Sequence, residues 1–231
     1  MPLDLPEYIS GSGILDAPIE FEWPEKNPED VYTTPDERLA GRMAKTSQRG
    51  ILALSAGTSE WIAWRFSGHA EILTILNLTE AMWATMIDWR YLKIGAMLDA
   101  REWRGQVRGP LKATFSLLVD VALHVFRDEA STPEAVCLSR LAQYVLPHER
   151  IFTDWRSQII TRLAKWYPPV EIGIGEPIPR IAIDPTVEYS ADLAPAALHD
   201  FVRHLNPANN PYLRPTAEMK AKGFEGDPYP Q

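Results

Sequence analysis

The sequence predicts a mainly α-helical protein: a single-domain bundle of about six or more helices, with an extended N-terminal arm and a C-terminal tail. Three observations favour this class. Apolar residues recur at the spacing of one helix face in several long segments, capping sequences precede two of these segments, and only two short segments have a strand-like pattern. Amphipathic helices bury their apolar faces against one another, so a helical bundle or an array of helical hairpins is the physical expectation.

The arm is expected over residues 1–33, the helical domain over 34–205 and the tail over 206–231. The arm contains five prolines and should therefore be extended. Within it Ile19, Phe21 and Trp23 alternate with glutamates, which predicts a short strand whose apolar side lies on the body.

The first helix is expected to begin in TTPDERL, with Thr34 as the N-cap, Pro35 at the first helical position and Glu37 completing a capping box. It should run towards Phe66, and a break near Gly50 is an alternative, because glycine weakens a helix interior by about 1 kcal/mol. A second helical stretch is expected over 69–91, with an interruption at 77–79 as an alternative.

A third helix over 110–128, with Pro110 at its start, is apolar on so many sides that we expect it to be central. A fourth helix is expected from Ser131, which has capping-box spacing to Glu134, as far as Pro147. A fifth over 148–166 should end before two prolines. The residues that follow should form a loop, with a short strand at RIAID, before a last helix over 193–205.

The composition is that of an ordinary globular protein, because 45% of the 231 residues are hydrophobic and 23% are charged. No run approaches the roughly 18 consecutive apolar residues that cross a bilayer, and the start, MPLDLPEY, lacks the features of a signal peptide. The single cysteine, Cys137, cannot form an internal disulfide, which suits a reducing compartment. We therefore expect a cytoplasmic protein.

The negative charge of the chain is concentrated in the arm. The net charge is −8, and residues 1–37 contain ten acidic side chains against Lys26 alone. Such an arm repels nucleic acid and anionic membranes and attracts basic protein surfaces, although the simpler alternative is solubility. The residues that we expect to contact a partner are Glu20, Glu22, Glu25, Glu29 and Asp30.

No motif predicts a catalytic residue, a metal site or a cofactor. Asp120, His124 and Asp128 follow each other at four-residue spacing and could line up on a helix, but the strongest apolar face of that helix lies on the other side. His199 and His204 do not converge on a helix. We interpret Cys137, between apolar residues, as a buried inert thiol.

The end of the chain resembles the endings of small bacterial immunity proteins that are paired with contact-dependent or type VI secreted toxins. The residues that resemble them are NPYLRP (210–215), AEM (217–219) and KGFEGDPY (222–229). The resemblance implies a non-catalytic cytoplasmic inhibitor that binds a toxin domain and occludes its active site, and it supplies no catalytic residues.

Three classes of function therefore stay open. The leading hypothesis is an antitoxin-like inhibitor of a basic protein partner, in which the acidic arm makes the contact. The second is a helical enzyme whose site would include His124, Asp120 and Glu60. The third is a structural subunit whose tail docks on a neighbouring chain.

Overall fold

The structure is a computed structural model that describes residues 3–15, 17–95 and 97–230, and it confirms the all-α prediction. Nine α-helices, four 3-10 helices and no β-strand form within these residues. The α-helices are α1 (Glu7–Ser10), α2 (Glu37–Met43), α3 (Gln48–Arg65), α4 (Leu73–Thr85), α5 (Gly105–Phe126), α6 (Thr132–Val145), α7 (Glu149–Trp166), α8 (Ala194–His204) and α9 (Thr216–Ala221). The 3-10 helices are η1 (Pro28–Val31), η2 (Trp89–Tyr91), η3 (Arg180–Ile183) and η4 (Ala191–Leu193).

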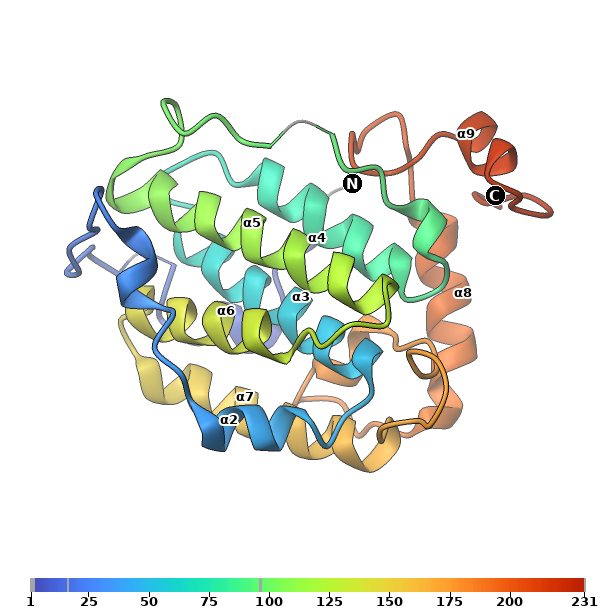
Figure 1. The fold of residues 1–231 in the computed structure, drawn as a ribbon, viewed down its shortest axis with the longest axis horizontal. Coiled ribbons are helices and arrows are strands. Elements are labelled where there is room, and N and C mark those ends of the chain that lie inside the picture. Colours follow the sequence, from blue (N-terminus) through green and yellow to red (C-terminus); the bar gives the residue numbers. More distant parts are fainter. Residues whose placement is uncertain (1–2, 16, 96, 231) are drawn as a thin grey trace.

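Helix α3 is the centre of the bundle (Figure 1). It packs against α4, α5, α6 and α7, and every residue from 50 to 63 is buried. Its small residues allow close packing: a Cβ added at Gly57 would lie 2.4 Å from Ile183 and 3.0 Å from Trp155. The buried hydroxyls of Ser55 and Thr58 each donate to a carbonyl of their own helix at 2.8 Å.

Helix α5, the segment that the sequence favoured as central, keeps one side exposed. It packs against α3, α4 and α6, while Asp120 is exposed. By length and composition alone α5 could cross a membrane, but 61% of its most apolar window is buried inside the bundle. A core helix of a soluble protein passes the same test, and the fold is compatible with a soluble protein.

The helix starts differ from the expected caps. Helix α2 is capped by Asp36, whose carboxylate accepts a hydrogen bond from the Leu39 amide at 2.9 Å, so Thr34 is not the cap. The chain breaks after α2, and Ser47 caps α3 by accepting from the Gly50 amide. The hydroxyl of Ser131 donates to Gln48 at 2.6 Å instead of capping α6.

Several helix bounds also differ from those expected. Helix α4 is continuous, because the hydroxyl of Thr79 donates to the carbonyl of Ile75 one turn back in the same helix and does not start a new one. Helix α5 begins at Gly105, so Pro110 lies inside it. The RIAID segment forms η3 and no strand.

The arm is only partly extended, because it contains α1 and η1, and its described residues form no strand. The side chains of Ile19, Phe21 and Trp23 are partly buried against the core, whereas Glu20 and Glu22 between them are exposed. The alternation therefore survives without a partner strand, because an extended chain places successive side chains on opposite sides.

At the other end of the molecule, α8 runs across the direction of the bundle helices, with α9 beyond it (Figure 1). The segment between them returns to the body, where Leu213 is 1% exposed and forms an isolated β-bridge with Leu92. The rings of Phe224 and Tyr229 lie edge-on to the ring of Tyr91, 5.8 and 5.6 Å away.

Candidate functional site

The arm is attached to the bundle by hydrogen bonds to its main chain. Arg65, which is 1% exposed at the end of α3, donates to the carbonyl of Ile14 at 3.3 Å and to that of Pro18 at 2.8 Å. Further along, Tyr144 donates to the carbonyl of Glu22. These donors hold the backbone and leave the acidic side chains free.

Aromatic packing adds to this attachment. The ring of Phe21 lies 6.2 Å from Phe66 and 5.5 Å from Tyr144. The indole of Trp23 lies directly over Gly109 of α5, where an added Cβ would be 2.2 Å from its Nε1. Only a glycine permits this approach, so the arm and α5 fit together at one residue.

The five acidic residues named from the sequence are all exposed. Within the described ranges, none of them takes part in an ion pair. Glu25 differs from the other four because its carboxylate accepts a hydrogen bond from the Gly105 amide, at the N-terminus of α5, where a negative charge is favourable. We call the other four exposed carboxylates of the arm, those of Glu20, Glu22, Glu29 and Asp30, the arm surface.

A cavity of about 590 Å³ lies between the N-terminal segment, η3 and α8, and we call it the α8 cavity. Its charged lining includes Asp4, Glu80, Asp184 and Asp200, together with Arg180 and His204. Its other lining includes Tyr8, Phe201, Leu3 and Ile181. Carboxylates therefore outnumber cations in a space that is otherwise largely aromatic and aliphatic.

The guanidinium of Arg180 is already engaged. Its Nη2 lies 2.5 Å from one carboxylate oxygen of Glu60 and its Nε lies 3.0 Å from the other. Glu60 is completely buried in α3 and also accepts from the indole of Trp83 at 2.9 Å. This pair joins η3 to the centre of the bundle and neutralises the cation nearest to the cavity.

Glu80 and Tyr8 are polar groups of the α8 cavity whose burial is only partly compensated. Glu80 is 7% exposed, accepts from Asn210 at 2.8 Å, and has its pKa raised by burial. The hydroxyl of Tyr8 is buried and has no hydrogen-bond partner within the described residues. Burial, followed by the charge of Glu60, raises its pKa well above the ordinary value, so the hydroxyl stays protonated.

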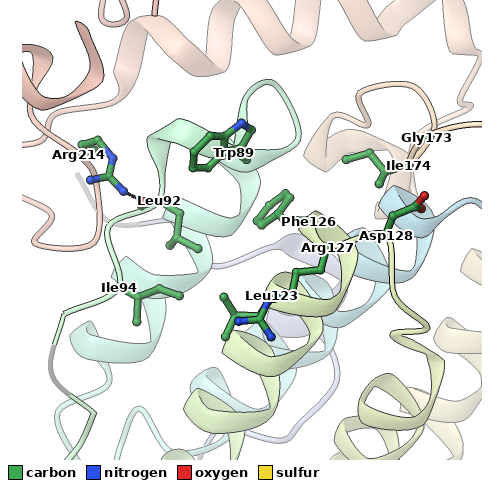
Figure 2. A pocket seen from close by; sticks show the side chains of 10 residues that line it. All are labelled: Trp89, Leu92, Ile94, Leu123, Phe126, Arg127, Asp128, Gly173, Ile174 and Arg214. Atoms are coloured by element: carbon green, nitrogen blue, oxygen red, sulfur yellow. Dashed lines mark hydrogen bonds between the residues drawn. The ribbon is translucent and has the colours of Figure 1, made fainter. Parts of the chain in front are cut away.

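A second cavity, of about 580 Å³, is mainly apolar (Figure 2). The side chains of Trp89, Phe126 and Ile174 face the same space, which is also lined by Leu123 of α5 and by Leu92 directly after η2. Trp89 is 51% exposed at this site. Arg214 also lines it, but its guanidinium is bound to the carbonyls of Arg90 and Leu92.

Of the residues of the enzyme hypothesis, Asp120 and His124 lie one turn apart on α5, whereas Glu60 lies in α3 with different partners. His124 lies 3.2 Å from Glu134 and 3.8 Å from Glu129, whereas Glu60 contacts Arg180 and Trp83. Asp128 lies beyond the end of α5 with φ of 56°, so it does not continue the helical row of Asp120 and His124. Within the described residues no group of three or more His, Cys, Asp or Glu side chains is placed to hold a metal ion.

Of the remaining candidates, His204 lines the α8 cavity, whereas His199 and Cys137 do not. The Nδ1–H of His204 donates to the carbonyl of Asp200 in its own helix at 2.8 Å, and His199 is exposed. Cys137 is half-buried, and burial raises the pKa of its thiol, which keeps the thiol protonated.

The α8 cavity was missed from the sequence, apart from Glu60 behind it. One signal could have indicated it: Glu60 and Glu80 are carboxylates inside buried apolar stretches, and a charge in such a place needs a partner.

Comparisons with protein-family models, with curated proteins and with solved structures find no match to this chain.

Proposed function

We propose that this protein is a non-catalytic inhibitor that binds a basic protein partner through its arm surface, in the manner of an immunity protein that neutralises a toxin. The observation that carries the proposal is that Glu20, Glu22, Glu29 and Asp30 are exposed and outside any described ion pair, on a segment attached to the bundle. The C-terminal resemblance to immunity proteins points in the same direction.

An acidic surface of this kind acts on association. Opposite charges on two proteins accelerate their encounter, and the effect falls as salt rises. Because the arm is held by Arg65 and by the contact of Trp23 with Gly109, little conformational freedom is lost when a partner binds. A partner with a basic cleft would be covered by such a surface and so blocked.

The test is affinity capture from a lysate of the source organism, with mass spectrometry and a toxicity assay. The expected result is one stoichiometric basic protein that is toxic when expressed alone and harmless when expressed with this chain. Capture of no such protein, repeated under several growth conditions, would contradict the proposal.

The contact surface is tested with two matched variants. E20K/E22K/E29K reverses three charges of the arm surface, and E171K/E188K/E225K reverses three exposed charges elsewhere. Glu25 is left unchanged because its carboxylate binds the start of α5. The first variant should slow association by about tenfold or more at low salt, with a smaller effect at about 0.5 M salt. Equal effects of the two variants would remove the arm surface from the mechanism.

A further inference from the structure

We propose that the α8 cavity binds an organic cation, a primary ammonium or guanidinium group carried on an apolar stem. The cavity has the size of a small-molecule site, since such sites usually enclose about 300–1,000 Å³. It is separate from the arm surface and does not depend on the function proposed above.

The charges of the cavity indicate the sign of the ligand. Asp4, Glu80 and Asp184 take part in no ion pair within the described residues, and Asp200 has only the exposed ring of His204, 3.9 Å away. Arg180 adds little positive potential because Glu60 binds it. A cation would therefore enter a site of net negative charge that the chain itself does not neutralise within these residues.

Two buried polar groups indicate where the head of the ligand would lie. Glu80 is 7% exposed, and one of its carboxylate oxygens accepts a hydrogen bond from Asn210. The hydroxyl of Tyr8 is buried without a described partner, although buried hydroxyls are normally hydrogen-bonded. An ammonium or guanidinium group has several donors and would satisfy both groups.

The remaining lining indicates the stem. Tyr8 and Phe201 offer aromatic surface, and Leu3 and Ile181 offer aliphatic surface. Aromatic rings attract a cation and pack well against methylene groups, whereas a small inorganic cation would leave this surface uncovered. The lining thus favours an alkylamine or alkylguanidine over a metal ion.

Two sources carry this chemistry: a free amine, and a Lys or Arg side chain of another protein. Isothermal titration of the full-length chain, tagged only at its C-terminus, separates them. The probes are hexylamine for the free amine and N-acetyl-lysine methylamide for the side chain, with 1-hexanol and hexanoate as uncharged and anionic controls. Saturable binding of either amine, with no binding of the two controls, is the expected result.

The site is located with three variants. Glu80→Gln removes the charge and keeps an acceptor for Asn210, and it should lower the affinity for the amine by about tenfold or more. Asp200→Asn, at a residue whose side chain is 73% exposed, should lower the affinity by about two- to threefold. Glu188→Gln, at an exposed residue outside the cavity, should change nothing. Absence of binding by both amines, equal affinity for hexylamine and 1-hexanol, or an unchanged affinity in Glu80→Gln would overturn the proposal.

Discussion

Replacing Arg180 by methionine tests how the bundle tolerates its most deeply buried carboxylate. Glu60 is 0% exposed, and within the described residues Arg180 is the cation that pairs with its charge, while Trp83 is a neutral donor. Arg180→Met would leave a buried carboxylate without a cation. Breaking one side of a buried ion pair costs about 3–5 kcal/mol, and we take the lower end because 27% of the Arg180 side chain is exposed and water can replace part of its contact.

The expected loss is therefore about 3 kcal/mol in the free energy of unfolding, measured by urea unfolding with tryptophan fluorescence at neutral pH. The double variant E60L/R180M removes both charges and leaves unpaired the buried indole of Trp83 and the exposed carbonyl of Asp4, which water can reach, so it should lie about 1 kcal/mol below the parent. A loss below about 1 kcal/mol in Arg180→Met, or a double variant no more stable than Arg180→Met, would refute this account of the pair.

Three further predictions concern packing and pH. Gly57→Ala should destabilise the protein by about 1–3 kcal/mol, since the added Cβ would meet Ile183. The control Gly41→Ala, at a position where nothing lies within 4 Å, should be neutral or stabilising, and thermal unfolding compares the two variants. Burial raises the pKa of Glu80, so its ionisation costs stability above that pKa, and the cost disappears as pH falls through it. In urea unfolding, the free energy of unfolding of Glu80→Gln should therefore exceed that of the parent most at neutral pH and least at about pH 4.5. Burial raises the pKa of Tyr91 from 10.0 to about 12, so the tyrosine ionises first in the unfolded chain and the stability of the protein should fall between these two pH values. Tyr91→Phe should lose less stability over this pH range when unfolding is measured as a function of pH.

The sequence was sufficient for the class of fold because apolar periodicity is a local signal. Helices α7 and α8 lie within one residue of the ranges that it predicts, 148–166 and 193–205. Two of its errors, both in helix caps, occur where a local motif has a competing partner. Thr34 resembles a cap but Asp36 takes that place, and the hydroxyl of Ser131 is drawn to Gln48, a residue of another helix.

The central position of α3 was hidden by its composition. Glycines, serines and threonines lower its hydrophobicity, yet these are the residues that let four helices approach it, and their hydroxyls bond within the helix. Hydrophobic periodicity ranks α5 higher because its large aliphatic residues are easily counted. A helix surrounded on all sides needs small residues more than large ones.

The two candidate sites also differ in how far the sequence alone could predict them. Five acidic residues could be named in advance because the negative charge is concentrated in the arm, and the exposure of Glu20 and Glu22 follows from alternation along an extended segment. The α8 cavity joins Asp4, Glu80, Asp184 and Asp200, which are far apart in the chain. Such a set exists only after the N-terminal segment, η3 and α8 have been brought together, and no local pattern contains it.

Removing a carboxylate has different consequences in the arm surface and in the α8 cavity, and that difference makes the proposed amine site testable. An exposed carboxylate of the arm surface is solvated, so its loss changes association and hardly changes stability. Glu80 is buried with Asn210 as its described partner, so its charge costs stability until a cation or a proton arrives. A bound alkylamine and the Glu80→Gln substitution should each raise the unfolding temperature, and for the same reason. Their effects should therefore not add: amine that stabilises the parent should stabilise Glu80→Gln much less, and an undiminished effect would place the amine somewhere other than beside Glu80.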